Sequence, residues 1–318
     1  MKINTEKLDT DTHILITGGA GFIGSNLVRH LSEHGYTRIT VVDDESLGSR
    51  DSIAPYSHRF VKGDIRDVDC MEPLLNEADM VVHLAADTRV MDSIADPQKN
   101  FDINVVGTFR LLSLARAAGI RRIVMASTGG AILGDATPPI NEEMVARPLA
   151  PYGASKLCAE GYCSAFSAAY GMSIACLRFS NVYGPGSFHK GSVVAHFYKR
   201  LLTGEDLIVY GDGSQTRDFL YVEDLMDVIV KALASTRNGV FQLGSGRPTD
   251  LNELLDEMRA VLGEAFRSKV DYQDFRAGEV RETWCDIAKA RRELAFAPDT
   301  PLRTGLQDTW NWFLANRP

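Results

Sequence analysis

Short apolar runs alternate with helical patterns along the first part of the chain. The runs predict strands at residues 13–17, 38–44, 59–65, 78–86, 121–128 and 172–180. Between them, apolar residues recur at helical spacing over residues 21–35, 100–119 and 155–171. Such an alternation is typical of a parallel sheet that helices cover on both faces. We therefore predict an α/β protein with a Rossmann-type doubly wound parallel sheet.

The pattern becomes less regular after residue 180. Segments such as SVVAHFYKRLLTG, GVFQLGS and LNELLDEMRAVLG mix helical and strand-like patterns. We interpret residues 1–180 as the Rossmann domain and residues 181–318 as a smaller C-terminal mixed α/β lobe, with some strands that return to the main sheet. The sequence shows no internal repeat and no low-complexity linker.

Composition and charge exclude several classes of protein. The 318 residues are 45% hydrophobic and 24% charged, and the net charge is −8. Because no long basic run is present, we expect neither nucleic acid nor an anionic membrane surface as a partner. No apolar stretch approaches the ~20 residues needed to span a bilayer, and no N-terminal signal core is visible. The five scattered cysteines lack metal-ligand spacing, so we expect reduced thiols, a cytoplasmic location and no metal site.

A glycine-rich turn between the first strand and the first helix indicates a dinucleotide site. Gly18, Gly21 and Gly24 are spaced three apart in ILITGGAGFIGSNLV. The first permits a tight turn, the second lets the backbone approach a pyrophosphate, and the third lets the helix pack on the strand. Asp43 follows 19 residues after Gly24, close to the ~20 expected of an acid that binds the adenosine ribose. Because its carboxylate would repel a 2′-phosphate, we expect NAD rather than NADP.

Tyr152 and Lys156, in the segment PYGASK, form a second candidate site. Residues four apart share one face of a helix, which places the hydroxyl near the ammonium group. We expect Lys156 to lower the tyrosine pKa from its usual ~10, with a bound oxidised nicotinamide lowering it further. The phenolate could then take a proton from a sugar hydroxyl while the same carbon gives up a hydride. Taken alone this spacing is common and usually structural, but the upstream glycine turn favours catalysis.

The two sites belong to a longer series of motifs between residue 17 and about residue 280. The series includes TGGAGFIG, KGDIRD, VVHLAA, DINVVGT, PYGASK, LRFSNVYGP and IVYGDGSQTRDFLYVEDL. In this order and combination the chain resembles an extended short-chain dehydrogenase/reductase. Within that group it is similar to the nucleotide-sugar epimerases of the UDP-glucose (UDP-galactose) 4-epimerase type.

The resemblance implies a set of cofactor-binding residues. It places Asp64 and Ile65 beside the adenine, and Asn104 beneath the cofactor as the anchor of a loop. Lys156 would also bond the nicotinamide ribose. The full set implied for NAD is Gly18, Gly21, Phe22, Ile23, Gly24, Asp43, Asp64, Ile65, Leu84, Ala85, Ala86, Asn104, Tyr152 and Lys156.

The resemblance also implies a nucleotide-sugar site in the second lobe. Asn181 would bond the phosphate or the sugar, and Arg217 and Arg276 would clamp the pyrophosphate with their guanidinium groups. Tyr210 would stack on the base, and Glu279 would accept a ribose hydroxyl. The full set implied for the substrate is Asn181, Val193, Val194, Tyr210, Arg217, Arg276 and Glu279.

The segment ASTGGAILG departs from the family pattern. Members carry a serine or threonine here that bridges the sugar 4-hydroxyl and the tyrosine; Ser127 and Thr128 are both available, and we favour Thr128. Related 4,6-dehydratases need an Asp-Glu pair directly after the threonine, where this chain has Gly129 and Gly130. Members restricted to small sugars carry a tyrosine at the position of Thr283. The smaller threonine would leave room for an N-acetyl group, or it is an unrelated loop residue.

We therefore predict an NAD-dependent nucleotide-sugar 4-epimerase that acts through a transient 4-keto sugar on a UDP-hexose, either UDP-glucose/UDP-galactose or the N-acetyl forms. Helices around residues 98–118 and 153–170 resemble those of the family's dimeric four-helix bundle, so we expect a homodimer. One alternative is another NAD-dependent nucleotide-sugar enzyme: a UDP-glucuronate 4-epimerase, a 4,6-dehydratase or a reductase. The other is a non-catalytic dinucleotide sensor.

Overall fold

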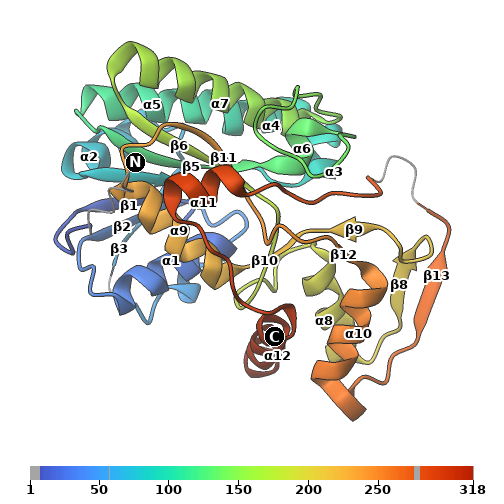
Figure 1. Ribbon diagram of the computed structural model, residues 1–318. Coiled ribbons are helices and arrows are strands. Elements are labelled where there is room, and N and C mark those ends of the chain that lie inside the picture. Colours follow the sequence, from blue (N-terminus) through green and yellow to red (C-terminus); the bar gives the residue numbers. More distant parts are fainter. Residues whose placement is uncertain (1–7, 57, 276–279, 318) are drawn as a thin grey trace.

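A sheet of seven parallel strands lies at the centre of the computed structural model, which describes residues 8–56, 58–275 and 280–317 (Figure 1). The strands are β1 (Ile14–Thr17), β2 (Ile39–Asp43), β3 (Arg59–Lys62), β4 (Met80–His83), β5 (Arg122–Thr128), β6 (Ser173–Phe179) and β11 (Gly239–Leu243). Their order is β11-β6-β5-β4-β1-β2-β3, and every neighbouring pair is parallel. The predicted Rossmann-type α/β fold is confirmed.

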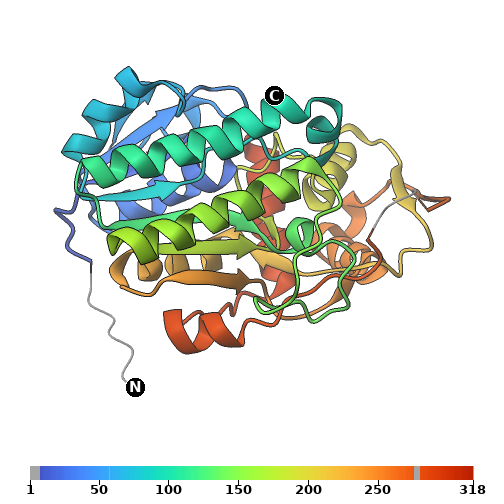
Figure 2. The same cartoon turned by 90° about the horizontal axis from the view of Figure 1, so that it is seen from above.

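Helices cover both faces of this sheet (Figure 2). One face carries α2 (Val68–Glu77), α5 (Thr108–Ala117) and α7 (Pro151–Tyr170), and the other carries α1 (Phe22–Glu33), α9 (Val222–Ala234) and α11 (Ala288–Leu294). Successive residues of a strand point to opposite faces. Leu15 therefore packs with the first set of helices, whereas Ile14 and Ile16 pack with the second. Because both faces are buried, functional side chains are left to the loops at the ends of the strands.

The helix that carries Tyr152 begins four residues earlier than its apolar pattern predicted. α7 starts at Pro151, in a first turn where a missing backbone N–H costs nothing. Tyr152 thus lies in the first turn, and Lys156 lies one turn further along the same face.

The predicted helix over residues 100–119 consists of three consecutive elements. α4 (Pro97–Phe101) leads into the π-helical segment η2 (Asp102–Gly107), which continues as α5. A short helix, α3 (Val90–Ala95), precedes them. The π-helical segment contains Asn104, and such segments are frequent at functional sites.

The later part of the chain also forms a lobe to one side of the sheet (Figure 1). Its strands form three short pairs: β7 (Asn181–Tyr183) with β10 (Phe219–Tyr221), β8 (Leu207–Tyr210) with β13 (Val270–Gln273), and β9 (Thr216–Arg217) with β12 (Thr249–Asp250). The remaining helices are η1 (Arg50–Ser52), α6 (Gly129–Leu133), α8 (Val193–Thr203), α10 (Leu251–Leu262), η3 (Gly263–Ala265) and α12 (Leu302–Ala315). A domain boundary near residue 180 stays a prediction, since α9, β11 and α11 complete the layers around the main sheet.

Within the described ranges, no helix combines the length and apolar character that crossing a membrane requires.

A buried histidine links strands β1 and β4 to helix α5. His83 Nδ1 lies 2.7 Å from Thr17 Oγ1, and its Nε2 lies 2.9 Å from Thr108 Oγ1. The side chain is only 2% exposed. Burial, and to a lesser extent the positive charge of Lys156, lower the pKa of His83 to about 3. The imidazole is therefore neutral at physiological pH.

This histidine makes the stability of the fold depend on pH. Below pH ~6.5 the imidazole of residue 83 binds a proton in the unfolded chain but not in the folded chain. The free energy of unfolding therefore falls as the pH is lowered. We expect His83 to contribute a loss of about 1.4 kcal/mol per pH unit below pH ~6.5. Denaturant titrations of the NAD-bound protein between about pH 7 and about pH 5 should show this slope. His83→Gln should reduce the slope by about 1.4 kcal/mol per pH unit, while His30, whose pKa burial also lowers to about 4, keeps its own contribution. The exposed control His189→Gln should leave the slope unchanged; equal slopes in all three proteins would contradict the assignment.

Candidate active site

The glycine turn after β1 is built for close approach to a ligand. Gly18 has a φ of +70°, and a Cβ atom there would lie 2.6 Å from the backbone nitrogen of Ala85, in the loop after β4. At Gly24 a Cβ atom would lie 2.3 Å from the carbonyl oxygen of Gly18. Helix α1 begins at Phe22, so the backbone N–H groups of its first turn, including those of Phe22 and Ile23, have no partners within the helix. This is the arrangement that binds a dinucleotide pyrophosphate.

The acidic residue at the end of β2 lies beside this turn. Asp43 Oδ2 accepts a hydrogen bond from the backbone N–H of Ala20 at 3.0 Å, and Oδ1 accepts one from Glu45 at 2.8 Å. Burial raises the pKa of this carboxyl. Each carboxylate oxygen has two acceptor sites, so ribose hydroxyls can still be bound. The residues present therefore fit the adenosine half of NAD.

Asp64 and Ile65, the expected neighbours of the adenine, are both occupied by contacts within the protein. Arg66 donates from Nη2 to Asp64 Oδ2 at 2.6 Å and from Nε to both carboxylate oxygens at 3.0 Å. This pairing lowers the pKa of the Asp64 carboxyl. Ile65 is buried. A ligand at this position would meet an ion pair rather than a lone carboxylate.

Asn104 holds the loop that follows β4, the strand whose continuation contains Leu84, Ala85 and Ala86. Its Oδ1 accepts from the backbone N–H of Asp87 at 2.8 Å, and its Nδ2 donates to the Asp87 carbonyl at 2.9 Å. Nδ2 also donates to Ser155 Oγ at 3.0 Å, on α7. Asn104 is itself only 1% exposed, so it acts on the loop through these bonds.

Helix α7 brings the proposed catalytic groups together at the end of β5. The hydroxyl of Thr128 hydrogen-bonds the hydroxyl of Tyr152. One turn further on, Lys156 Nζ donates to the carbonyl oxygen of Ala126 at 3.1 Å. Lys156 is 5% exposed, and burial lowers its pKa to about 8. The ammonium form therefore still predominates at neutral pH.

Of the two candidate hydroxyls, only Thr128 faces the tyrosine. Ser127 Oγ instead donates to Glu160 Oε1 at 2.6 Å, deeper between the sheet and α7. These contacts favour Thr128 as the hydroxyl that accompanies Tyr152, whereas Ser127 is buried against Glu160.

The expected lowering of the tyrosine pKa is wrong for the side chains alone. Burial raises the pKa of Tyr152 to about 12; the bond from Thr128 acts against this rise, while the negative charge of Asp87 adds to it. Burial outweighs any stabilisation from Lys156, whose ammonium group is bonded to a carbonyl oxygen. A lowering of this pKa by a bound oxidised nicotinamide stays a prediction.

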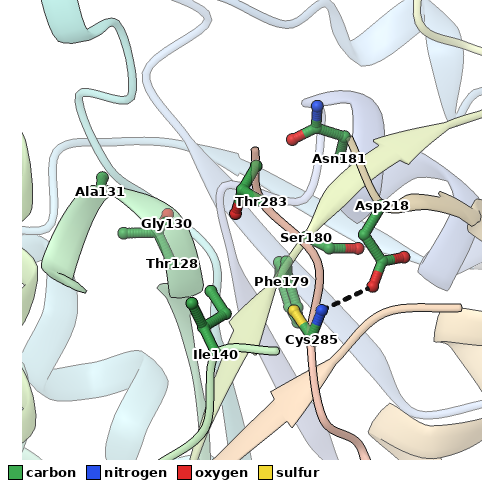
Figure 3. A pocket seen from close by; sticks show the side chains of 10 residues that line it. All are labelled: Thr128, Gly130, Ala131, Ile140, Phe179, Ser180, Asn181, Asp218, Thr283 and Cys285. Carbon is green, nitrogen blue, oxygen red and sulfur yellow. Dashed lines mark hydrogen bonds between the residues drawn. The ribbon is translucent and has the colours of Figure 1, made fainter. Parts of the chain in front are cut away.

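A pocket opens beside these hydroxyls, between β5, β6 and the segment around residues 283–285 (Figure 3). Thr283 faces Gly130 across it, and Asn181 and Asp218 lie on the side of the second lobe. The full lining is Thr128, Gly130, Ala131, Ile140, Phe179, Ser180, Asn181, Asp218, Thr283 and Cys285. The pocket therefore adjoins the hydroxyl of Thr128 and contains one of the predicted substrate residues.

One wall of the pocket depends on a buried carboxylate that sequence reasoning missed. Asp218 accepts from the backbone N–H groups of Ser245 at 2.6 Å, Gly246 at 3.2 Å and Cys285 at 3.1 Å. These bonds tie the turn after β11 to the segment that carries Thr283. Asp218 directly follows Arg217 in the motif IVYGDGSQTRDFLYVEDL, so the sequence could have indicated it as a site residue. No motif pointed to Ile140 or Cys285.

The other predicted substrate residues lie elsewhere in the second lobe. Val193 and Val194 begin α8, and Tyr210 ends β8. Arg217, on β9, donates from Nη1 to the carbonyl oxygens of Thr216 at 2.8 Å and of Arg281 at 3.3 Å. None of the four lines the pocket.

Arg276 and Glu279 fall outside the described residues, so their predicted roles stay predictions. All five cysteines are free thiols. Among the described residues, no three or more His, Cys, Asp or Glu side chains are grouped so that they could hold a metal ion.

Known proteins share this sequence and architecture. Residues 14–244 match the family described as the NAD dependent epimerase/dehydratase family. The UDP-glucose 4-epimerase of Mycolicibacterium smegmatis is 35% identical over 311 residues, which cover 94% of this chain and 97% of that protein. A dTDP-glucose 4,6-dehydratase from Actinoplanes is 34% identical, over 96% of this chain and 98% of that protein.

Solved structures agree with the sequence relatives. The UDP-glucose 4-epimerase of Thermotoga maritima, crystallised with UDP-glucose, superposes with a TM-score of 0.90 at 35% identity, covering 96% of this chain and 99% of that one. The UDP-N-acetylglucosamine 4-epimerase of Methanobrevibacter ruminantium, in complex with UDP-N-acetylmuramic acid, also gives 0.90, at 30% identity and the same coverage.

Proposed function

Because the chain belongs to the NAD dependent epimerase/dehydratase family, whose cofactor is NAD, we propose that it is a nucleotide-sugar 4-epimerase that acts on a UDP-hexose. The observation that carries this proposal is the joining of Thr128, Tyr152 and Lys156 beside a pocket. In the same chain, the glycine turn and Asp43 fit the dinucleotide.

Each residue of the site has a definable role in such a reaction. NAD, when bound, supplies a hydride acceptor and a positive ring beside the sugar. Tyr152 removes the proton of the 4-hydroxyl as C4 loses its hydride, and Thr128 bridges the two hydroxyls. Lys156 stabilises the phenolate by its charge. After the 4-keto sugar turns over in the pocket, Tyr152 returns the proton as hydride is added to the opposite face of C4.

The turn after Thr128 argues against a 4,6-dehydratase. Elimination of water needs an additional acid and base next to C5 and C6, and Gly129 and Gly130 cannot transfer protons. A Cβ atom at Gly129 would lie 2.5 Å from Gln242 Oε1, because the buried side chain of Gln242 fills the space where a carboxylate would project. A dehydratase arrangement at this position would require that side chain to move.

The pocket lining favours a neutral sugar over a uronate. No lysine or arginine is among the described residues that line it, and Asp218 contributes a carboxylate. A uronate carboxylate would thus find no cationic partner for a charge-assisted hydrogen bond among these residues. By contrast, Gly130, Ala131 and Thr283 are small residues, which leaves room for an N-acetyl group at C2.

We infer that the protein forms a homodimer through α5 and α7, which lie side by side on one face of the molecule (Figure 2). Their outer surface carries Phe109, Tyr162 and Tyr170, each about two-fifths exposed at 42%, 40% and 40%. Phe109 and Tyr162 already contact each other, with ring centroids 5.1 Å apart. Exposed aromatic residues of this kind are enriched at interfaces. A cytoplasmic location stays a prediction.

The proposed reaction can be tested without added cofactor. The purified protein should convert UDP-glucose or UDP-N-acetylglucosamine to its 4-epimer, with the products read by proton NMR. Tyr152→Phe should lose turnover by at least about 100-fold and retain NAD, because only the proton transfer is removed. Tyr170→Phe, on the same helix but outside the site, is the control. Undiminished turnover in Tyr152→Phe would rule out its assigned role. Product formation that requires and consumes added NADH would favour a reductase, and a 4-keto-6-deoxy product would favour a dehydratase.

Sugar choice should respond to the side chain at residue 283. Thr283→Tyr fills part of the pocket, so kcat/KM for UDP-N-acetylglucosamine should fall at least about tenfold more than that for UDP-glucose. Thr283→Ser preserves the small volume and serves as the control. An equal loss for both sugars in the tyrosine variant would show that C2 does not face this wall.

Association should depend on the aromatic surface of α5 and α7. Phe109→Glu places a charge in the proposed interface, so sedimentation equilibrium should show a shift from dimer to monomer. The exposed residue Phe275, in the second lobe, provides the control Phe275→Glu. A dimer that survives the change at residue 109 would place the interface elsewhere.

A further inference from the structure

Consecutive residues at the end of β5 contact successive residues along one face of α7. α7 presents Tyr152, Lys156 and Glu160 at four-residue steps, which places them in a row. The three consecutive residues 126–128 each contact one member of this row. Thr128 bonds Tyr152, the carbonyl of residue 126 accepts from Lys156 at 3.1 Å, and the hydroxyl of residue 127 donates to Glu160 at 2.6 Å.

The third member of the row is an ion pair that the proposed reaction does not use. Arg178, on β6, donates from Nε to Glu160 Oε1 at 2.9 Å and from Nη2 to Oε2 at 2.7 Å. Ser127 and Arg178 are direct neighbours on the paired strands β5 and β6, so both reach the same carboxylate. Ser127, Glu160 and Arg178 are only 4%, 5% and 4% exposed.

This pair is difficult to explain by stability. Removing two charges from water is costly, and replacing a buried ion pair by apolar residues of similar volume is often neutral or stabilising. The pair lies one helical turn from Lys156, which is itself almost fully buried. A second buried cation requires a compensating negative charge nearby, and Glu160 is the carboxylate in that position.

The groups around Lys156 support this reading. Burial is the main influence that lowers its pKa, and Glu160 is the strongest of those that raise it, followed by the thiols of Cys163 on α7 and Cys176 on β6. His83, on β4, is neutral.

We propose that Glu160, fixed by Arg178 and Ser127, is a positioning residue that keeps Lys156 charged and held at the carbonyl oxygen of Ala126, one helical turn from Tyr152. The inference rests on the proposed function for its catalytic consequence. The same three-residue strand end carries the acceptor of Lys156 and the partner of Tyr152, so a shift of Glu160 would also disturb both contacts.

The decisive measurement is the ionisation of Tyr152 in the NAD-bound protein. It can be followed by the ultraviolet absorbance of the phenolate, taken as the difference between each protein and its Tyr152→Phe counterpart. The test variant is Glu160→Met/Arg178→Met, which removes both charges together and avoids leaving either one unpaired. We expect it to fold and hold NAD, and Tyr152 to ionise at a pH higher by at least about one unit.

Turnover provides a second readout with a predicted direction. Without Glu160, Lys156 loses its proton at lower pH, so the alkaline limb of the kcat profile should move to lower pH and kcat at neutral pH should fall about tenfold or more. KM should change little, because neither residue lines the pocket. The control is Glu257→Met/Arg303→Met, which removes a bidentate pair of 2.7 and 3.0 Å between α10 and α12.

Each outcome bears on the inference separately from the reaction. An unchanged Tyr152 ionisation in a folded, NAD-bound double variant would overturn the role of Glu160. If the methionine variant does not fold, Glu160→Gln/Arg178→Gln, which keeps polar contacts, takes its place with the same expected shift. Failure of the unmodified protein to epimerise any sugar would overturn the proposed function, while the absorbance titration would still decide the inference.

Discussion

The burial of one ammonium group constrains most of what surrounds it. Lys156 is 5% exposed, and its ammonium group donates a hydrogen bond to the backbone carbonyl oxygen of Ala126 at 3.1 Å. A buried cation disfavours other positive charge nearby and requires negative charge within reach. The neutral His83 satisfies the first condition and Glu160 the second. Both the neutral His83 and the carboxylate of Glu160 therefore suit a buried Lys156, with the burial of His83 itself as the main cause of its low pKa.

In the proposed reaction, the same burial gives the cofactor a second role, because its positive ring would favour ionisation of Tyr152. Tyr152 lies in a medium that favours its neutral form, and Asp87 reinforces this preference. The protein supplies one cation, and the ring of bound NAD would supply a second. In the proposed reaction, Tyr152 would therefore act as a base only while the oxidised cofactor is bound.

The fold and part of the site could be predicted from the spacing of residues along the sequence. The features that could not be predicted depend on contacts between distant segments. The glycine turn, Asp43 and the Tyr152–Lys156 pair could be predicted because each depends on neighbours within one strand, turn or helix. Whether Ser127 or Thr128 faced the tyrosine depended on how the end of β5 meets α7, which spacing does not reveal. The direction of the tyrosine pKa depended on burial by distant segments.

The pocket wall was beyond sequence reasoning for the same reason. Ile140 and Cys285 come from segments more than a hundred residues apart and meet because the backbone N–H of Ile140 donates to the carbonyl of Trp284 at 2.8 Å. Gln242, which fills the space beneath Gly129, comes from a third segment. No short motif links these residues, so only the folded chain brings them together.

The edge strand β11 implies an order of events during synthesis. It pairs with β6, yet it follows that strand by about sixty residues, including α8 and α9. Until residue 234 has left the ribosome, α9 is incomplete and cannot cover its face of the sheet, and until residue 243 has left it, the backbone of β6 presents an unpaired edge. The strand that carries Arg178 therefore remains open while the glycine turn is already complete. The nascent chain therefore completes the glycine turn well before β11 covers the edge of β6, beside the buried Glu160–Arg178 pair. During this interval the exposed strand edge is most prone to aggregation.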